Sequence, residues 1–320
     1  MPSLRDLRDR IKSVKSTRKI TSAMKMVAAS KLKKAQLQAE ASQPYATAMA
    51  EMLGRVAKNV LIGPGSNKLL AGTGSDKRHL IVVVSADRGL CGGFNANIIK
   101  EARKIIRDLI AQGKDVYVIC AGRKARDLLS REFKSRIWES FTGITGKSRV
   151  DFAEANKVTE LVLDKFMANE FDVCTLVYNE FKSILTQKPT CQQLIPVSLP
   201  DPEELQKEKE KREKAEATKQ GIRRKKVVEA GPTGPISPYD FEPEEGLILN
   251  TLLPRNIGVQ IFRALLDSAA GEQAARMTAM DAATRNSGDM INNLNLKYNR
   301  ARQAYITKEL IEIISGAEAL

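Results

Sequence analysis

The sequence predicts an α/β protein in which two long helices, one near each end of the chain, pair as an antiparallel left-handed coiled coil beside a Rossmann-like parallel α/β domain. Three observations predict this fold: an amphipathic helical pattern at the start, alternating strand and helix patterns in the middle, and an apolar repeat with a period of 3.5 near the end. We expect an N-terminal helix over 1–58, an α/β domain over 77–200, a basic flexible insert with a following segment over 201–243, and a C-terminal helix over 244–320.

The N-terminal helix is predicted from residues 3–58, which contain only Pro44 and Gly54 as helix breakers. Its first apolar stripe steps by 3, 4 and 3 residues along Leu4, Leu7, Ile11 and Val14. After a shift near Thr17, we expect the same stripe to continue along Ile20, Met24 and Val27.

The middle of the chain alternates short apolar runs with helical patterns. The runs HLIVVVSAD (79–87), DVYVICAG (115–122) and DVCTLVYNEF (172–181) predict three buried strands. Helices are expected from near Asn95, around 124–130 and over 151–169. This β-α-β-α order indicates a parallel sheet, which is a statement about fold and not about function.

A second long helix is predicted from about Leu252 onward. Its seam alternates steps of 3 and 4 along Met277, Met280, Thr284, Ser287, Ile291, Leu294, Tyr298, Ala301 and Tyr305. Helices over 3–58 and 255–318 would be about 80 and 95 Å long, whereas a compact domain of residues 77–200 has a radius of gyration of about 14 Å. We therefore expect a projecting rod, which suits a mechanical or docking element better than an enzyme.

The net charge of +14 is concentrated in two segments. Residues 1–40 hold 11 Lys and Arg against 3 Asp and Glu, and residues 206–226 hold 10 against 4. A local basic surplus indicates an acidic partner: nucleic acid, an anionic membrane surface or a carboxylate-rich protein face. Pro and Gly residues flank the second segment, so we expect it to lie in a flexible insert.

The composition argues against several kinds of site. His79 is the only histidine, which leaves no set for a His-ligated metal cluster or a His-based catalytic triad. Four cysteines without a C-x-x-C pair indicate reduced thiols. The apolar runs stop far short of the ~20 residues of a membrane-spanning helix, and the N-terminus has no apolar secretory core. We therefore expect a soluble intracellular or organelle-interior protein.

Two glycine-containing segments are similar to phosphate-binding loops without completing the pattern. GLCGGFN follows a strand and precedes a helix, but Gly89, Gly92 and Gly93 do not give G-x-G-x-x-G. FTGITGKS is similar to a Walker A loop, but Phe141 stands where the first glycine must be. We interpret the first segment as a tight structural turn, and no nucleophile–base set indicates catalysis.

Three segments in order resemble the γ subunit of F-type ATP synthases: SLRDLRDRIKSVKSTRKITSAMKMVAASKLKKAQ, SADRGLCGGFN and EQAARMTAMDAATRNSGDMINNLNLKYNRARQAYITKELIEIISGAEAL. The likeness covers nearly the whole chain except residues 200–236. It implies that the terminal helices form a central shaft and that the α/β domain forms a foot above a membrane ring. It also implies a rotor without an active site of its own, which transmits torque from the ion-driven ring for ATP synthesis, or in reverse for ion pumping.

The resemblance further implies partners and a location. The partners are the α and β subunits of a catalytic hexamer, an epsilon/delta-type central-stalk subunit and the c-ring, with no nucleic acid. Mg-ATP and Mg-ADP would be bound by partner subunits, and no cofactor or metal by this chain. The chain would lie peripherally on an energy-coupling inner membrane, on the bacterial cytoplasmic face or the mitochondrial matrix side.

Individual residues match the family's motifs. The resemblance implies contacts with the β subunit for Met24, Arg276, Arg302, Gln303, Thr307 and Glu309. It implies contacts near the membrane ring for Tyr239, Phe241 and Glu242.

The insert departs from the family pattern. Photosynthetic relatives carry a regulatory dithiol in this region, and residues 200–236 contain no cysteine. We hypothesise that the ten Lys and Arg of residues 206–226 contact anionic headgroups or acidic stator faces. Two alternatives to a rotor are a coiled-coil nucleic-acid-binding or scaffold protein, and a nucleotide-binding enzyme.

Overall fold

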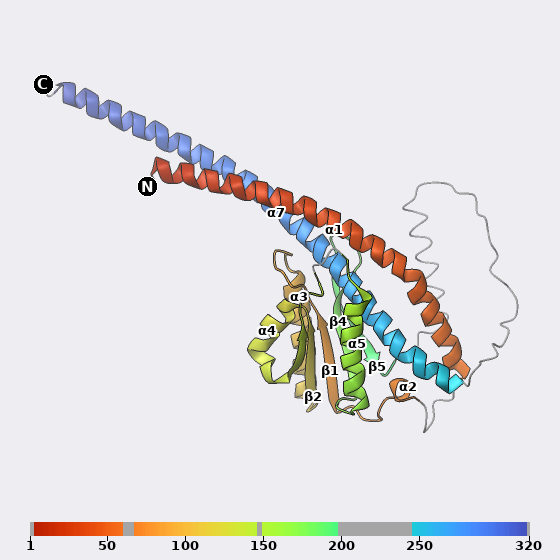
Figure 1. The fold of residues 1–320 in the computed structure, drawn as a ribbon. Coiled ribbons are helices and arrows are strands. Elements are labelled where there is room, and N and C mark those ends of the chain that lie inside the picture. Colours follow the sequence, from red (N-terminus) through yellow and green to blue (C-terminus); the bar gives the residue numbers. More distant parts are fainter. Residues whose placement is uncertain (1–2, 60–66, 146–148, 198–244, 319–320) are drawn as a thin grey trace, which may run out of the picture.

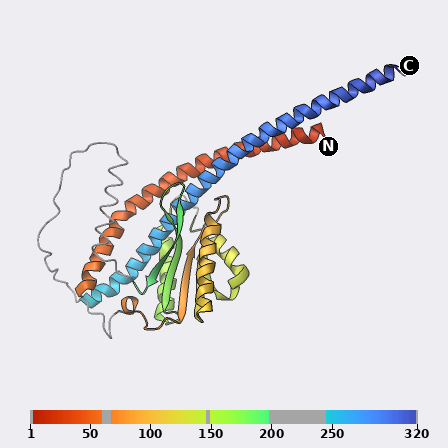
Figure 2. The same ribbon diagram turned by 180° about the vertical axis from the view of Figure 1, so that it is seen from behind.

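The computed structural model describes residues 3–59, 67–145, 149–197 and 245–318. Helices α1 (Leu4–Asn59) and α7 (Glu245–Glu318) run antiparallel side by side, so both ends of the chain lie toward the same tip (Figure 1). The view from behind shows the same pairing, with α7 extending beyond the start of α1 (Figure 2). At 1.5 Å per residue, the 74 residues of α7 span about 110 Å. The predicted projecting rod of terminal helices is confirmed.

A five-stranded sheet organises residues 67–197, which we call the sheet domain. Its strands are β1 (Arg78–Val84), β2 (Asp115–Ala121), β3 (Ile137–Phe141), β4 (Val173–Phe181) and β5 (Gln187–Ile195). They lie in the order β3-β2-β1-β4-β5, with β1 to β4 parallel and β5 antiparallel to β4. The strand order reverses between β1 and β4, as it does in a Rossmann sheet.

Helices cover both faces of this sheet. The sheet domain contains α2 (Lys68–Ala71), α3 (Phe94–Ala111), α4 (Arg123–Phe133), the 3₁₀ turn η1 (Lys134–Arg136) and α5 (Phe152–Met167). Leu80 and Val82 of β1 pack in the cluster formed with α5 and α7, whereas Ile81 and Val83 pack in the cluster formed with α3 and α4. Because both faces are buried, β1 is apolar at successive positions rather than at alternate ones.

The three predicted strands and the three predicted helices of the middle region are present. β3 and β5 were not predicted. Because β5 runs antiparallel to β4, the sheet is mixed rather than wholly parallel as expected. β5 reads QKPTCQQLI, and an edge position in the sheet tolerates its polar residues and Pro189.

The second long helix begins before its helical pattern becomes clear in the sequence. The pattern is recognisable from about Leu252, whereas α7 starts at Glu245, next to the expected domain bound of 244, and Pro254 lies inside it. Leu249 and Leu253 are buried in the core beneath α7. Their packing offsets the hydrogen bond that proline removes from a helix interior.

A buried carboxylate ties the start of β4 to the start of β1. Asp172 is 1% exposed. Its Oδ2 accepts from the backbone N–H of Arg78 at 3.1 Å, and its Oδ1 accepts from Arg78 Nη2 and from the Thr73 hydroxyl, each at 2.8 Å. The hydrogen bonds from Arg78 lower the pKa of the Asp172 carboxyl because they favour its charged form.

Replacing Asp172 by Ala is expected to lower the free energy of unfolding at pH 7 by about 2–4 kcal/mol, since it removes charge-assisted hydrogen bonds to a buried acceptor. The folded-state pKa of Asp172 lies below the unfolded value of about 3.9, so this stabilisation is present above about pH 4 and is lost as the pH falls. Urea unfolding of the wild-type chain and D172A at pH 7 and pH 3 measures the difference. Asp108→Ala removes an exposed carboxylate of α3 and is the control. An equal effect of D172A at both pH values would contradict the role of the ion pair.

Candidate functional site: the rod surface and its junction with the sheet domain

The rod is the part of the molecule in which α1 and α7 pack against each other, from their junction with the sheet domain to the tip. The buried seam residues of α1 have heptad spacing and are Leu7, Ile11, Thr21, Ala28, Leu32 and Ala35. The facing buried residues of α7 are Ala270, Ala274, Met280, Ser287, Ile291 and Leu294. The predicted seam of α7 also includes half-buried residues, which are Met277, Thr284, Tyr298 and Ala301. The predicted seam is therefore confirmed as far as Ala301.

The prediction that Tyr305 continues the seam is wrong. Tyr305 is 54% exposed. The start of α1 packs through Leu7 against Leu294 and Tyr298, and α1 begins at Leu4. No part of α1 therefore remains to cover Tyr305.

Small and polar side chains fill the middle of the rod. The hydroxyl oxygens of Thr21 and Thr284 lie 2.8 Å apart across the seam. Lys25 Nζ donates to Asp281 Oδ1 at 2.6 Å. Polar pairs of this kind set the register of two helices at a cost in apolar contact. The rod thus holds together through a narrow and only weakly apolar seam.

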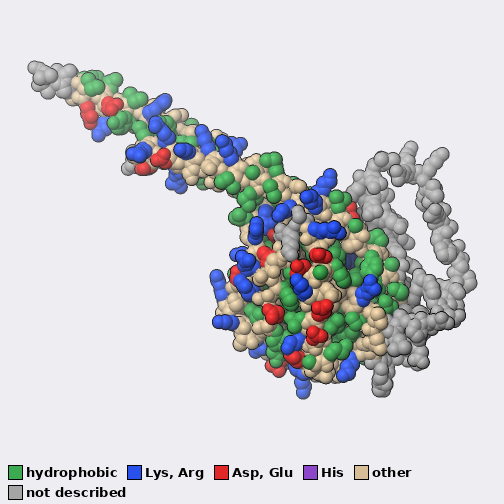
Figure 3. All heavy atoms as spheres, in the orientation of Figure 1, with side chains coloured by type: hydrophobic (Ala, Val, Ile, Leu, Met, Phe, Trp, Pro, Cys, Tyr) green, Lys and Arg blue, Asp and Glu red, His purple; other side chains and the backbone are tan. Residues whose placement is uncertain are grey.

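The predicted continuation of the apolar stripe of α1, along Ile20, Met24 and Val27, lies outside this seam. Ile20 and Val27 are each 57% exposed, and Met24 is half-buried beside the seam. The prediction that Ile20 and Val27 are buried is wrong, because the seam follows the smaller residues one position later, Thr21 and Ala28. Apolar side chains are consequently left on the surface of the rod, where Figure 3 shows them between Lys and Arg.

The C-terminal end of α7 extends past α1 and carries four of the predicted site residues (Figure 1). These residues are exposed and are Arg302, Gln303, Thr307 and Glu309. On the same end, Ile306, Leu310 and Ile313 recur at helical spacing and are 52%, 54% and 71% exposed. An exposed apolar stripe on a helix without a neighbour indicates an interaction surface.

Cations gather near the start of α1. Arg8, Lys12, Lys15 and Lys19 line a groove of about 420 Å³ with Ile11 and Ser16, and no carboxylate is among these lining residues. Arg8 Nη2 also donates to the hydroxyl of Tyr298 at 3.0 Å. The tip of the rod therefore combines a basic groove with exposed apolar side chains.

Arg276 lies where α7 leaves the sheet domain. Its Nη2 donates to Glu272 Oε1 at 2.7 Å and to the backbone oxygen of Gly89 at 3.2 Å, and its Nη1 donates to Gln273 Oε1 at 3.2 Å. The Arg276 side chain is 12% exposed. This guanidinium therefore joins α7 to the loop after β1. Sequence reasoning missed Glu272, although its position one helical turn before Arg276 was a usable signal.

Polar groups of the chain itself occupy the start of α4, at the carboxyl edge of the sheet. Asp87 Oδ1 accepts from the N–H of Arg123 at 2.9 Å, and Ser85 Oγ accepts from the N–H of Ala125 at 2.8 Å. Gly122 has a φ of 121°, and a Cβ at this position would lie 2.2 Å from the backbone oxygen of Ser85. Side chains of the protein thus bind two of the first amides of α4, which a helix N-terminus could otherwise offer to an anion.

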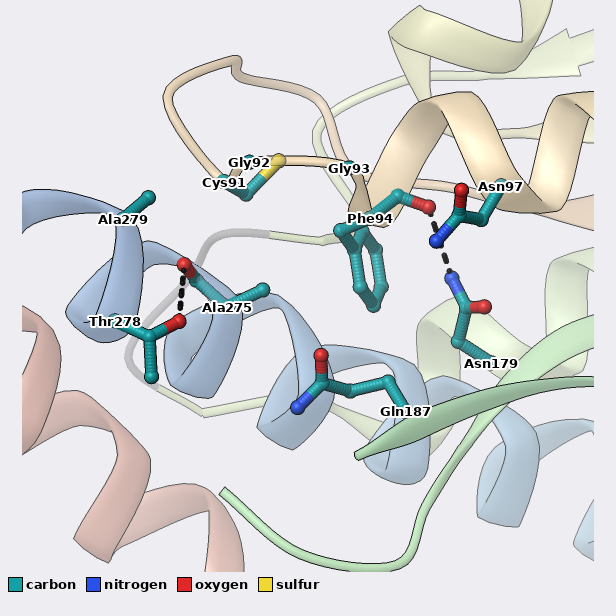
Figure 4. Close-up of a pocket in the computed structure, with 10 residues that line it drawn as sticks. All are labelled: Cys91, Gly92, Gly93, Phe94, Asn97, Asn179, Gln187, Ala275, Thr278 and Ala279. Atoms are coloured by element: carbon teal, nitrogen blue, oxygen red, sulfur yellow. Dashed lines mark hydrogen bonds between the residues drawn. The ribbon is translucent and has the colours of Figure 1, made fainter. Parts of the chain in front are cut away.

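The start of α3 borders a pocket of about 280 Å³ (Figure 4). The loop Cys91–Gly93 forms one wall, and Ala275, Thr278 and Ala279 of α7 form another. The ring of Phe94 projects toward α7, and Asn179 Nδ2 donates to the backbone oxygen of Phe94 at 3.3 Å. A helix of the chain therefore lies against the crevice where Rossmann domains bind ligands. GLCGGFN forms the structural turn that was predicted, whereas residues 146–148 of FTGITGKS lie outside the described residues.

Some predicted site residues cannot be placed. Tyr239, Phe241, Glu242 and the basic segment 206–226 lie outside the described residues. Among residues 3–59, 67–145, 149–197 and 245–318, no group of three His, Cys, Asp or Glu is arranged to hold a metal ion. The helices in these ranges include none that is long and apolar enough to span a bilayer.

Comparisons with known proteins identify the family. A family model described as ATP synthase matches residues 3–320. The ATP synthase gamma chain of Paramagnetospirillum magneticum is 52% identical over 320 residues, and that of Rhodospirillum rubrum is 51% identical over 325, with 100% of each chain covered.

Solved structures share the fold. A chain of the Tetrahymena thermophila mitochondrial ATP synthase central stalk/c-ring is 27% identical with a TM-score of 0.54, and the match covers 82% of this chain and 99% of that one. A chain of the Euglena gracilis mitochondrial ATP synthase rotor is 16% identical with a TM-score of 0.56, over 95% and 98% of the two chains. The paired terminal helices, the Rossmann-order sheet and the full-length likeness to gamma chains agree, and this chain belongs to the ATP synthase gamma-chain family.

Proposed function

We propose that this chain is the rotating central-stalk subunit of an F-type ATP synthase, which carries torque between an ion-driven membrane ring and a catalytic hexamer. The observation that carries this proposal is the rod, whose longer helix spans about 110 Å and ends beyond both the sheet domain and α1 (Figure 1). The 27% identical chain from a central stalk/c-ring structure supports the same role.

In this role the chain supplies shape and contacts rather than a catalytic group. An asymmetric rod presents different side chains to each surrounding subunit as it turns, and contacts that differ between orientations bias the conformation of each nucleotide site. Moving one charge across 100 mV supplies about 2.3 kcal/mol, so several charges must cross the membrane for each ATP that is made. Mg-ATP and Mg-ADP are bound by the partner subunits in this proposal.

Three surfaces of the rod are suited to the α and β subunits. The edge formed by Ile20, Met24 and Val27 offers apolar contact along the rod. The end of α7 adds Arg302, Gln303, Thr307 and Glu309 as polar contacts beside the exposed isoleucine and leucine stripe. The basic groove at the start of α1 suits a carboxylate-rich protein face, which accounts for the charge surplus of residues 1–40 without nucleic acid.

The opposite end of the molecule is assigned to the membrane ring. Tyr239, Phe241 and Glu242 immediately precede α7, whose start lies at the end of the molecule away from the rod tip (Figure 1). We assign to this end the c-ring and an epsilon/delta-type stalk subunit, which places the chain peripherally on an energy-coupling membrane.

Co-purification and rotation test the proposal together. The tagged chain is expected to recover α and β subunits, and a bead attached to it is expected to rotate in the assembled complex when ATP is added. Recovery without α and β subunits, or a complex in which the chain stays still during hydrolysis, would overturn the proposal.

Met24→Lys is expected to reduce ion pumping per ATP by about fivefold, because a charge added at a half-buried contact changes its energy by about 1 kcal/mol. ATP hydrolysis is expected to fall much less, since this chain holds no catalytic group. Proton or sodium uptake by vesicles, measured beside hydrolysis, gives the ratio. Met26→Lys, at a position that is 66% exposed two residues later, is the matched control and is expected to have a smaller effect. Equal losses of pumping and hydrolysis in M24K would count against the assignment.

Changing Ile306, Leu310 and Ile313 together to Gln is expected to leave the thermal stability of the isolated chain within about 0.5 kcal/mol, because these side chains are exposed on an unpaired helix. In the complex, the same change is expected to slow ATP synthesis, since it removes apolar contacts with the surrounding subunits. Leu294→Gln, in the seam, is the control that should destabilise the isolated chain. An unchanged synthesis rate in the triple variant would show that this end does not contact its partners.

A further inference from the structure

A buried carboxylate lies where the two rod helices meet the sheet domain. Glu272 of α7 is 1% exposed, and its Oε1 accepts from Arg276 Nη2 at 2.7 Å. Its Oε2 has no hydrogen-bond partner among the described residues. A single buried ion pair with one unsatisfied oxygen is an expensive arrangement, because desolvation of a carboxylate is only partly offset by one partner. Such an arrangement calls for a role other than general stability.

Charged groups from three parts of the molecule act electrostatically on this carboxylate. Arg276 comes from α7, Lys31 comes from α1, and Asp87 comes from the loop after β1. Burial raises the pKa of Glu272 and Asp87 raises it further, while Arg276 and then Lys31 act in the opposite direction. Arg276 also donates to the backbone oxygen of Gly89, in the same loop as Asp87. The pair therefore connects both rod helices electrostatically with the sheet domain.

The neighbouring residue brings α7 into close contact with the sheet domain. A Cβ built on Gly271 would lie 3.1 Å from the Phe94 ring and 3.3 Å from Gln187 Cγ. Phe94 begins α3 and Gln187 begins β5, so α7 is held between two elements of the sheet domain at this point. One turn later, Ala275 packs with Cys91 and Phe94. These contacts leave α7 little freedom to turn independently of the loop after β1.

We propose that the Glu272–Arg276 pair is a positioning element that locks the loop Asp87–Cys91 onto α7 and so keeps the rod from twisting relative to the sheet domain under load. The inference rests on the proposed rotor function and deepens it. It assigns the torsional coupling of rod and domain to one buried pair and one loop, and it gives Arg276 an intramolecular role.

Labelling of Cys91 tests the lock in the isolated full-length chain. Cys91 is buried against Ala275 and lies in the locked loop, whereas Cys191 is exposed and is replaced by Ser to remove background. Glu272→Gln keeps the side-chain volume and removes the charge, and it is expected to raise the rate of Cys91 modification by DTNB about 10- to 100-fold. Asp281→Asn removes the exposed ion pair with Lys25 inside the rod, and it should leave the rate unchanged.

A second variant keeps the test decisive if E272Q does not fold. Modification of the core residues Cys120 and Cys174 reports global unfolding, because both are fully buried. If they react in E272Q, Arg276→Lys replaces it: Lys keeps a cation beside Glu272 but cannot reproduce the forked contacts with Glu272 and Gly89. Faster modification of Cys91 alone is the expected result for R276K.

The assembled complex supplies the functional half of the test. Single-molecule measurement of rotor stiffness is expected to show a softer connection in E272Q than in D281N, with a matching loss of ion pumping per ATP. Unchanged Cys91 reactivity in both lock variants would overturn the proposal, and so would faster Cys91 modification with unchanged stiffness. If the wild-type chain itself fails to rotate, the proposed function fails, whatever the labelling shows.

Discussion

The architecture depends on α7 being a single helix that contributes both to the core of the sheet domain and to the rod. Leu253, Ile257 and Leu265 are fully buried in the sheet-domain core, while Ile291 and Leu294 pack in the rod. Burying each large apolar side chain contributes about 1.5–3 kcal/mol, so the lower part of α7 is firmly anchored. A rotation of the sheet domain is consequently transferred to the rod by the backbone hydrogen bonds of α7, which run from the buried part of the helix around Leu265 into the rod.

The rod differs from this anchor in how it uses apolar side chains. Its seam contains Thr21, Ala28, Thr284 and Ser287, whereas larger residues such as Ile20 face outward. A seam of this composition gives up apolar contact between α1 and α7 and leaves apolar area on the outside of the rod. In a protein that worked alone this distribution would be a liability. It becomes useful when other subunits surround the rod and supply the missing contacts.

Long repeating patterns were predictable from the sequence. Which of two adjacent residues on a helix is buried against its neighbour was not predictable. The period of 3.5 in α7 and the apolar runs of β1, β2 and β4 each extend over enough residues to outweigh a single exception. In α1, the exposed residues Ile20 and Val27 each lie one position before a seam residue. Only the pairing with α7 decides that Ala28 rather than Val27 is buried. The edge strand β5 was missed because its sequence is polar and contains Pro189. The spacing of Glu272 and Arg276 predicts a pair on one helix face, but the contact of that pair with Gly89 and the influence of Asp87 could not be predicted, because both residues are distant in sequence.

The carboxyl edge of the sheet shows how a ligand-binding architecture can serve a mechanical purpose. At this edge the loops after β1 and β4 diverge, which in Rossmann domains opens a crevice for a nucleotide. In this chain, Phe94 and Gln187 approach Gly271 from those two sides, and Asp87 accepts from the Arg123 amide at the start of α4. A helix that is packed against elements on both sides of a crevice is held against rotation more firmly than a helix that contacts only one face of the sheet. The same topology that positions a substrate in other proteins therefore positions a shaft here, and the buried Glu272 lies one residue beyond Gly271.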